Sequence, residues 1–268
     1  MKIYLLLKKC YTIFCSRPIR KVLAFLNKHG HKKKCYICKR EFNSFGLYGK
    51  GSKGVPDFIK ELNLVGSDID NYSCIFCGCH DRERHLFMYF DRLQLWDKIA
   101  QCKVLHFAPE KYISKKILSI RPISYIMADL NPMGKSILCI DATNIPYPDK
   151  SFDFILCNHV LEHITNYKKA IDEIYRVLNF GGIAILQTPF SRVLENNFED
   201  EGINTNELRL FFYGESDHRR IFSEKQLAGE FISAGFVLKL ITNNSLFDKS
   251  TSVYYGINYN EDLYMLTK

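Results

Sequence analysis

The second half of the chain alternates short apolar runs with segments whose apolar residues recur at helical spacing. The apolar runs predict strands at Lys103–Phe107, Ile123–Ala128, Phe152–Asn158, Ile183–Gln187, Phe236–Ile241 and near Asp262–Thr267. The helical spacing predicts helices at Arg84–Ala100, Tyr112–Ser119, Tyr167–Leu178 and Glu224–Ala234. Strands and helices in this alternating order are typical of βαβ units. We therefore expect an α/β fold in which helices cover both faces of a parallel sheet.

Two of these helices carry further signals. The apolar face of Tyr167–Leu178 is followed by Gly181-Gly182, and glycine readily adopts the left-handed conformation that ends many helices. We expect a glycine cap there, with a strand immediately after it. The helical spacing of Arg84–Ala100 runs without interruption, which predicts one continuous connecting helix.

Length and composition fit a globular chain with one main core and an appendage. The chain has 268 residues, of which 47% are apolar and 25% are charged, whereas a single domain commonly has about 100 to 200 residues. The apolar run from Ile3 to Leu7 stops at Lys8 and Lys9, far short of the roughly 20 residues that cross a bilayer. We expect neither a membrane-spanning helix nor a secretory signal.

Positive charge is concentrated near the start of the chain, in residues 1–34, which we call the basic arm. The first 40 residues contain twelve Lys or Arg and no Asp or Glu, so the remaining residues carry a net charge of −4. A short amphipathic helix is predicted in the arm by the spacing of Ile19, Val22, Leu23 and Leu26. Such a helix suits an anionic membrane surface, nucleic acid, or the chain's own globular domain.

Two pairs of cysteines are spaced as metal-binding turns. Four of the ten cysteines form two CxxC units, Cys35, Cys38, Cys74 and Cys77. A structural zinc ion takes four thiolates in a tetrahedron, and a chain of this length needs no disulfide framework. We expect a small zinc-ribbon-like lobe at residues 35–80, in the reducing cytoplasm, with Cys79 as an alternative ligand. Four free thiols are the other interpretation.

Polar side chains follow the predicted strands, where ligands of open parallel sheets bind. Glu110 follows the first strand, Asp129 ends the second, Asp141 comes 12 residues later, and Asn158 ends the next. An acidic residue about twenty positions past the first turn accepts hydrogen bonds from both hydroxyls of a ribose. Asp129 suits that role, and it also suits the capping of an ordinary loop.

Collinear motifs surround these strand ends, between about residues 103 and 190. They read Ile126-Met-Ala-Asp129, Asp141-Ala-Thr-Asn-Ile-Pro-Tyr-Pro148 and Ser151-Phe-Asp-Phe-Ile-Leu-Cys-Asn-His-Val-Leu-Glu-His163, followed by Gly181-Gly182. As a set they resemble class I S-adenosylmethionine-dependent methyltransferases, most of all the small-molecule branch. The resemblance implies a Rossmann-like doubly wound sheet and a methyltransferase domain at residues 81–268. The CxxC units with Val104-Leu-His-Phe-Ala-Pro-Glu110 resemble a bacterial group associated with surface-polysaccharide biosynthesis.

The resemblance implies a role for each residue at the strand ends. Asp129 would bind the ribose hydroxyls of S-adenosylmethionine, and Asp141 with the amide of Ala142 would bind the adenine. Asn158 and His159 would line the site of the methyl donor. The implied cofactor site is completed by neighbouring residues, namely His106, Ala108, Glu110 and Leu130.

One part of the chain departs from this family. Class I methyltransferases normally have a glycine-rich turn after the first strand, whereas this chain has no glycine between Gly78 and Gly134. Pro109 has no N–H to donate, so we expect a remodelled turn, with weak or lost cofactor binding as one outcome. Glu110 offers a compensating contact, because its carboxylate can pair with the ammonium group of the cofactor.

The connection at residues 190–222 predicts an acceptor-binding insertion, because connections of this length usually cover a site or bind a substrate. It contains Asp217-His218-Arg219-Arg220, in which the aspartate can orient the histidine and the arginines can bind an anionic acceptor. A hydroxyl acceptor must lose a proton to a base. We expect that base to be His218, ahead of His159, and we expect His163 to be structural.

These observations favour O-methylation of a small molecule or saccharide, in cell-surface polysaccharide biosynthesis as the resemblance implies. An RNA methyltransferase is the second candidate, since a zinc lobe and a basic arm suit nucleic acid, although the negative net charge of the other residues opposes it. A noncatalytic binding domain is the third, because the first turn lacks glycine. We place the protein in the cytoplasm, with the basic arm as a candidate contact to the inner membrane face.

Overall fold

The computed structural model describes residues 30–268, so the amphipathic helix predicted in the basic arm lies outside the described residues. The chain forms two compact units, each assembled from separate stretches of sequence. The cysteine unit comprises the described part of Met1–Val55 with Ser67–Arg92 and Asn243–Asn260. The sheet unit comprises Pro56–Gly66, Leu93–Thr242 and Glu261–Lys268. Among the residues described, no helix is both long enough and apolar enough to cross a membrane.

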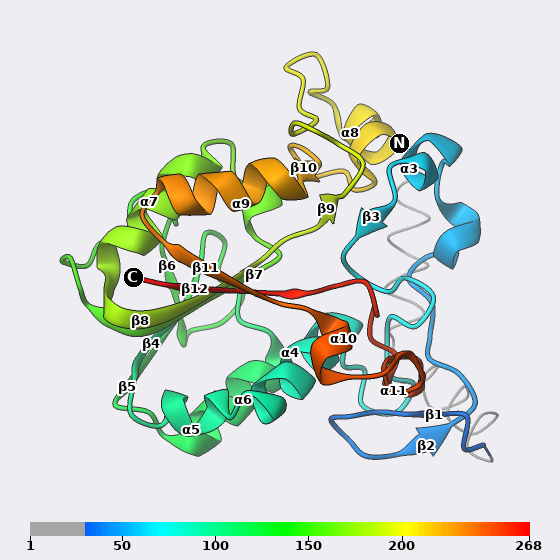
Figure 1. The fold of residues 1–268 in the computed structure, drawn as a ribbon, viewed down its shortest axis with the longest axis horizontal. Helices are drawn as coiled ribbons and strands as arrows, with labels where there is room; N and C mark the ends of the chain where they lie inside the picture. The colour runs from blue at the N-terminus through cyan, green and yellow to red at the C-terminus, as the bar shows by residue number, and fades with distance from the viewer. Residues whose placement is uncertain (1–29) are drawn as a thin grey trace. The chain divides into compact units, whose positions relative to one another are not determined.

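The described part of the sheet unit is built on a central seven-stranded sheet (Figure 1). In chain order its strands are β4 (Lys103–Phe107), β5 (Ser124–Asp129), β6 (Ile137–Cys139), β7 (Phe152–Asn158), β8 (Leu178–Gln187), β11 (Val237–Ile241) and β12 (Leu263–Thr267). Across the sheet the order is β11-β12-β8-β7-β4-β5-β6, and β12 pairs antiparallel with both its neighbours. The first five strands run parallel in the Rossmann order, which confirms the expected parallel sheet for these strands, whereas β12 makes the whole sheet mixed.

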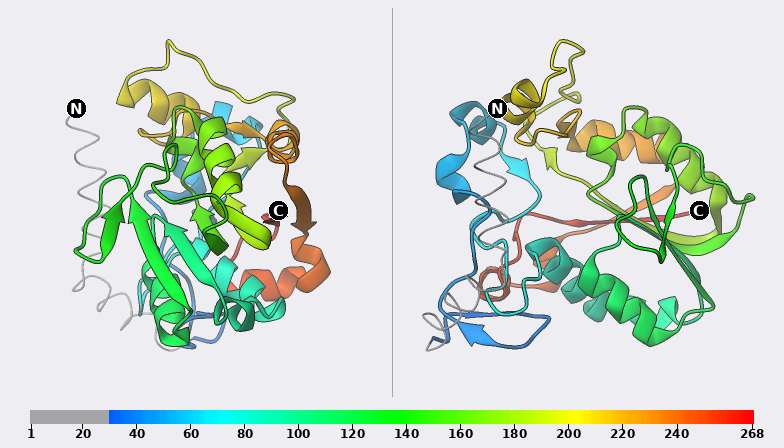
Figure 2. Two further views of the ribbon diagram at one scale, coloured as in Figure 1. Left: turned by 90° about the vertical axis from the view of Figure 1, so that its left-hand side faces the viewer. Right: turned by 180° about the vertical axis from the view of Figure 1, so that it is seen from behind.

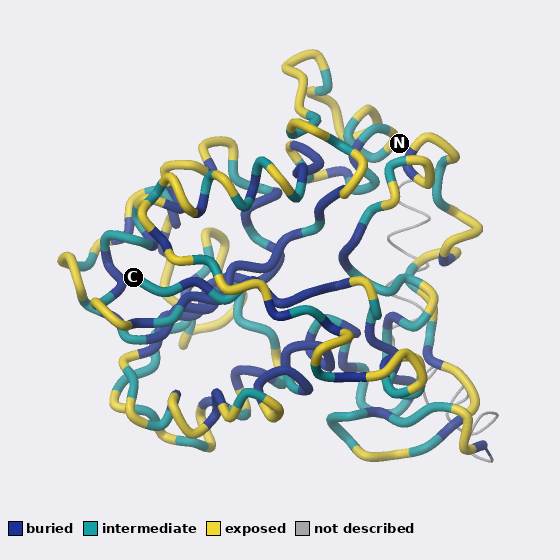
Figure 3. The backbone as a smooth tube through the Cα atoms, in the orientation of Figure 1, coloured by how far each residue is buried: buried dark blue, intermediate teal, exposed yellow. Residues whose placement is uncertain are grey.

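Helices of the sheet unit cover both faces of this sheet. They are α5 (Leu95–Ile99), α6 (Lys111–Ile120), α7 (Tyr167–Val177) and α9 (Glu224–Ser233). Figures 1 and 2 show α7 and α9 on one face and α5 and α6 on the other. β7 is buried along almost its whole length between these layers (Figure 3), as expected of a central parallel strand.

The single helix predicted at Arg84–Ala100 is two helices in the structure. α4 (Asp81–Arg92) ends before Gln94, whose φ of 54° is left-handed, and α5 begins at the next residue. A right-handed helix cannot continue through a left-handed residue, although the apolar spacing runs on across it. The break coincides with the division of the chain, since α4 belongs to the cysteine unit and α5 to the sheet unit.

The glycine cap predicted after Tyr167–Leu178 is also wrong. α7 ends at Val177, and β8 begins at once with Leu178, which pairs with Phe152. Gly181 lies in an irregular stretch of β8, with φ 75°. The glycine therefore permits a local bend within a strand rather than the end of a helix.

The predicted insertion at residues 190–222 is an ordered part of the sheet unit. It contains β9 (Phe190–Ser191) and α8 (Asn206–Tyr213), and β10 (Phe222–Ser223) follows at its end. β9 pairs with β10 and with β3 (Leu64–Val65), which forms a small second sheet. The Phe58 ring of α3 (Asp57–Glu61) packs against the Phe212 ring of α8, with centroids 6.0 Å apart. Residues 56–66 thus belong to the sheet unit, whereas the predicted lobe at 35–80 included them.

The cysteine unit surrounds the buried side chain of Arg84 on α4. Its other regular elements are β1 (Lys33–Lys34), β2 (Glu41–Phe42), the 3-10 helix η1 (Gly51–Gly54), α10 (Asn243–Leu246) and α11 (Lys249–Tyr255). The Arg84 guanidinium donates to the carbonyls of Cys79 at 3.1 Å and Tyr255 at 3.0 Å. This contact joins the cysteine-bearing segment to residues 243–260, which the predicted boundary at residue 81 separates from it.

Candidate functional site

The carboxyl ends of β4, β5, β6 and β7 meet at one edge of the central sheet, because these strands run parallel. Phe107 of β4 is level with Ala128 of β5 and with Cys157 of β7, and Asp129 of β5 is level with Cys139 of β6. We call this edge the carboxyl edge. The predicted side chains that it brings together on neighbouring strand ends are Glu110, Asp129, Asp141 and Asn158.

Glu110 is held by two side chains at the carboxyl edge. Its Oε2 lies 2.8 Å from Nε2 of His106, and its Oε1 accepts a hydrogen bond from the amide of Asn158. His106 is fully buried, and its Nδ1 lies 2.8 Å from the Tyr125 hydroxyl. Burial raises the pKa of Glu110, but contacts with His106 and Asn158 outweigh burial and lower the net pKa. Glu110 is therefore a carboxylate at neutral pH, and its side chain is 18% exposed.

The turn after β4 is left-handed although it lacks glycine. Ala108 has φ 45°, and its N–H donates to the carbonyl of Ala128 at 2.8 Å. A non-glycine residue adopts this conformation at a cost of about 1–2 kcal/mol, and alanine brings the smallest side chain. α6 begins at Lys111, directly after the turn, so its N-terminus favours a negatively charged group at the carboxyl edge. The turn therefore contains a left-handed residue, Ala108, although it has no glycine.

Asp129 and Asp141 each close a local turn at a strand end. Asp129 Oδ1 accepts the N–H of Asn131 at 2.7 Å. Asp141 Oδ1 accepts the N–H and the hydroxyl of Thr143 at 2.8 Å and 2.9 Å. One oxygen of each carboxylate thus serves the turn, and a carboxylate has two oxygens, so loop capping and ligand binding are compatible. The adjacent predicted residues are Leu130, which is 61% exposed, and Ala142, which is buried.

After β7, a buried carboxylate lies among imidazoles, in a group that we call the histidine cluster: His159, Glu162, His163 and His218. Glu162 is 1% exposed, and the Thr188 hydroxyl donates to its Oε2 at 2.8 Å. Its Oε1 lies 3.4 Å from Nδ1 of His159 and 3.9 Å from Nε2 of His163. Burial raises the pKa of Glu162, but His159 and the other imidazoles outweigh burial and hold the net pKa far below its usual range.

His218 reaches the histidine cluster from the end of the insertion. Its ring stands edge-on to the ring of His163, with centroids 4.9 Å apart. Burial lowers the pKa of His218 to about 4, against a raising contribution from Glu162. The predicted bases His218 and His159 therefore lie in one cluster, although far apart in sequence.

Asp217 contacts a different histidine from the one predicted. The sequence predicts that Asp217 orients His218 and that His163 is structural. In the structure, Oδ2 of Asp217 lies 3.7 Å from Nδ1 of His163. His163 thus stands between two carboxylates, those of Asp217 and Glu162.

Arg220 fixes the segment that carries His218. The Arg220 guanidinium is buried, donates to the carbonyls of Ile164 at 2.5 Å and Thr165 at 2.9 Å, and pairs with Glu199. The predicted grip of Arg220 on an anionic acceptor is wrong, because its N–H groups are used within the fold.

Two further buried residues adjoin the cluster and were not predicted from the sequence. Glu261 is 2% exposed, and its Oε1 lies 3.7 Å from Nε2 of His159. Thr188 holds Glu162, as described above. Neither residue stands in a motif: Glu261 precedes β12, and Thr188 follows β8, so only the strand-end position of Thr188 was a usable signal.

The four CxxC cysteines form a compact group in the cysteine unit, with their sulfur atoms within 4.8 Å of one another. Sγ of Cys35 is 3.8 Å from Sγ of Cys77, and Sγ of Cys38 is 3.7 Å from Sγ of Cys74. Thiolates placed tetrahedrally about 2.3 Å from a zinc ion stand roughly 3.8 Å apart, so the spacing fits the metal. Sγ of Cys79 lies 3.4 Å from Sγ of Cys35. This distance is shorter than the roughly 3.8 Å between two sulfurs that share a zinc ion, so Cys79 suits a neighbour of the site better than a ligand.

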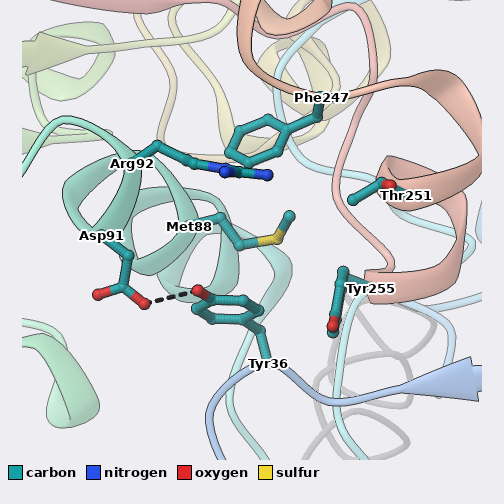
Figure 4. A pocket seen from close by; sticks show the side chains of 7 residues that line it. All are labelled: Tyr36, Met88, Asp91, Arg92, Phe247, Thr251 and Tyr255. Atoms are coloured by element: carbon teal, nitrogen blue, oxygen red, sulfur yellow. Dashed lines mark hydrogen bonds between the residues drawn. The ribbon is translucent and has the colours of Figure 1, made fainter.

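A separate pocket of about 380 Å³ lies within the cysteine unit (Figure 4). Its lining side chains are Tyr36, Met88, Asp91, Arg92, Phe247, Thr251 and Tyr255. The Tyr36 hydroxyl donates to Asp91 at 2.6 Å, and Figure 4 shows Arg92 alongside Phe247. The lining contains none of the residues predicted for the cofactor, the acceptor or the metal.

The central part of the sheet unit is similar in sequence to known proteins. Residues 113–186, from α6 into β8, match the family model described as a methyltransferase domain. An uncharacterized methyltransferase of Bacillus subtilis, YcgJ, is 34% identical over 92 residues, which are 32% of this chain and 36% of that protein. The ubiquinone/menaquinone biosynthesis C-methyltransferase UbiE of Hydrogenovibrio crunogenus is 40% identical over 55 residues, 20% of this chain and 21% of that protein.

The chain spans only part of the length of the curated relatives that it matches. The five curated relatives are matched over 21% to 36% of their own length. A solved S-adenosylmethionine-dependent methyltransferase from Mesorhizobium loti has a TM-score of 0.49 at 10% identity, over 68% of this chain and 98% of that one. The strand order shows a mixed α/β, Rossmann-like fold with a mostly parallel central sheet, and residues 113–186 of it are similar to methyltransferase domains.

Proposed function

We propose that this protein is an S-adenosylmethionine-dependent methyltransferase. The observation that carries the proposal is the carboxyl edge, where polar side chains stand on four neighbouring parallel strand ends. Ligands of open parallel sheets bind beyond this edge, and three of the four strands, β5, β6 and β7, lie in the segment that matches a methyltransferase domain.

The nucleoside part of the cofactor fits the ends of β5 and β6. The Asp129 carboxylate suits the two ribose hydroxyls, because it can accept two hydrogen bonds. Asp141 and the Ala142 amide suit the amino edge of adenine. The exposed side chain of Leu130 offers an apolar surface to the flat base.

The methionine part fits the end of β4. Glu110 is an ionised, partly exposed carboxylate that suits the ammonium group, and the α6 N-terminus suits the carboxylate. His106 and Asn158 hold Glu110 in place, and Ala108 shapes the turn. These contacts replace the usual glycine-rich turn.

The methyl acceptor belongs beside the histidine cluster, which follows directly after Asn158 of β7. When bound, S-adenosylmethionine supplies an electrophilic methyl group, so the protein orients the acceptor and excludes water. A hydroxyl acceptor also needs a proton acceptor, and the imidazoles of His159 and His218 are the candidates. The presence of these candidate bases supports O-methylation of a small molecule or saccharide. The resemblance supports a place in surface-polysaccharide biosynthesis.

A structural zinc ion at the four CxxC cysteines is part of the proposal. Their sulfur spacing supports it, and so do the short elements of the cysteine unit, which need a cross-link. The contact of the basic arm with an anionic membrane and the cytoplasmic location stay predictions from the sequence.

Calorimetric titration of the full chain with S-adenosylmethionine tests the proposed function. We expect binding by the wild-type protein and a loss of roughly 100-fold or more in Asp129→Ala, because two charge-assisted hydrogen bonds are lost. Asp172→Ala is the matched control, since it removes an exposed carboxylate from α7. Folded wild-type protein that gives no binding heat would overturn the proposal.

An RNA acceptor is the second candidate from the sequence, and it is distinguishable in solution. Binding of RNA that weakens steeply as salt rises would favour it, because phosphate contacts release counterions. Binding of a saccharide acceptor should change little over the same range of salt.

A further inference from the structure

Three metal-ligating side chains of the sheet unit gather within the histidine cluster. One donor atom from each of Glu162, His163 and His218 lies within 4.8 Å of the other two. Glu162 and His163 come from the 3-10 helix η2 (Leu161–His163), and His218 comes from the segment before β10. Two imidazoles and one carboxylate are a known ligand set for divalent first-row metals. We propose that these three residues bind a divalent metal ion, at a second site in addition to the cysteines.

The contact between Glu162 and His163 is too long for a hydrogen bond and leaves room for an ion between the two ligands. Oε1 of Glu162 stands 3.9 Å from Nε2 of His163, whereas hydrogen bonds of this kind measure about 2.7–3.2 Å. Two ligands that share one ion, each about 2.1 Å from it, stand roughly 3.0–3.4 Å apart. Small turns of the side chains close the site, and the His163 side chain, 37% exposed, has room to turn.

Neighbouring side chains direct the donor atoms toward one another. The Thr188 hydroxyl donates to Oε2 of Glu162, so Oε1 is the oxygen that faces the imidazoles. Asp217 approaches Nδ1 of His163, so the opposite nitrogen, Nε2, faces Glu162. A carboxylate behind a ligating histidine is the usual outer contact of metal sites in proteins.

Backbone contacts hold the distant ligand His218 against the other two. The N–H of Arg219 donates to the carbonyl of Glu162 at 2.8 Å. The Arg220 guanidinium binds the carbonyls of Ile164 and Thr165. The fold therefore brings the three donor atoms together through contacts that involve none of their side chains.

Three protein ligands leave coordination positions open, as in catalytic metal sites. A consequence that rests on the proposed function is that an acceptor hydroxyl bound there loses its proton more readily. The proton then passes to His159, since His218 serves as a ligand. The acceptor oxygen forms its bond to the methyl carbon as the carbon–sulfur bond breaks, and the bonding electron pair stays on sulfur.

Counting bound metal in the full chain tests the inference. The probes are Zn²⁺, counted by atomic emission, and Mn²⁺, followed by electron paramagnetic resonance, because nitrogen and oxygen ligands accept Mn²⁺ whereas thiolates select zinc. We expect one ion per chain more in the wild type than in His163→Ala or His218→Ala. Each variant should also bind Mn²⁺ at least about tenfold more weakly.

A surface histidine provides the matched control. Nδ1 of His31 stands 2.6 Å from Oε2 of Glu41, but the His31 side chain is 87% exposed. His31→Ala should therefore keep the wild-type metal count and Mn²⁺ affinity. Equal counts in all four proteins, with each variant folded by circular dichroism, would overturn the metal site.

Titration of the same samples with S-adenosylmethionine separates this inference from the proposed function. Cofactor binding without the additional ion would overturn the metal site alone. The additional ion without cofactor binding would support the metal site and overturn the proposed function.

Discussion

The four CxxC cysteines and the histidine cluster both consist of side chains of the types that bind metals, but the chain assembles them in opposite ways. The cysteines come from two tight local turns, so each pair of ligands is visible in the sequence. In the histidine cluster, Glu162 and His163 are neighbours, whereas His218 arrives from the end of an insertion and is held by Arg220. Local ligand pairs can be read from spacing, and a ligand delivered by a tertiary contact cannot.

Of the changes considered, removal of zinc from the four CxxC cysteines should lower the stability of the protein most. Structural zinc contributes about 10 kcal/mol or more to the folding of small zinc domains, and the elements around the cysteines are short. We expect chelation, or Cys74→Ser, to lower the melting temperature by roughly 10 °C or more, measured by calorimetry with a parallel zinc count.

The control for this change is a cysteine outside the group. Cys102 belongs to the sheet unit, where its Sγ donates to the Lys98 carbonyl at 3.0 Å. Cys102→Ser should keep the zinc and melt within a few degrees of the wild type, since serine retains a donor. A wild-type melting temperature after complete metal removal would contradict the structural role of the zinc.

Arg220→Ala should displace His218 from the histidine cluster without removing any of the proposed metal ligands. The change leaves the carbonyls of Ile164 and Thr165 and the carboxylate of Glu199 without their charged partner, which costs about 3–5 kcal/mol. We expect a melting temperature lower by several degrees and loss of the additional metal ion. Affinity for S-adenosylmethionine should change less than roughly threefold, because Arg220 does not contact the carboxyl edge.

The adjacent Arg219 is the control for Arg220. It is exposed, and its contact with Glu162 uses the backbone N–H, which alanine retains. Arg219→Ala should therefore keep both the melting temperature and the metal count. If both arginine variants lost the ion equally, the proposed positioning role of Arg220 would be untenable.

The sheet was predictable from the sequence because its strands are marked locally. β7 lies at the predicted Phe152–Asn158, and the residues that end neighbouring strands do gather at one edge. The helix break at Gln94 was not predictable, since one left-handed residue leaves the apolar spacing unchanged. The assignment of residues 243–260 to the cysteine unit depends on long-range contacts such as Arg84 with Tyr255, which no local pattern records.

The candidate site shows the same limit. Glu110, Asp129 and Asp141 were predicted because each follows a strand, and a strand end is a local position. Arg220 was misread as a ligand for an anionic acceptor, because residue type does not reveal whether a charge is buried or solvated. Glu261 was missed because it adjoins His159 only through the fold.

Ala108→Gly should have the smallest effect, and it tests the turn after β4, which has a left-handed residue but no glycine. The left-handed conformation of Ala108 costs about 1–2 kcal/mol, whereas glycine adds about 0.4–1 kcal/mol of unfolded-state entropy. The folded-state term is the larger, so the variant should gain stability and melt roughly 1–4 °C higher. Ala100→Gly is the control, because Ala100 has an ordinary φ of −56° and should only lose stability. A destabilised Ala108→Gly would mean that the alanine methyl makes contacts worth more than the strain of the turn, and would remove the view that Ala108 stands in for a glycine.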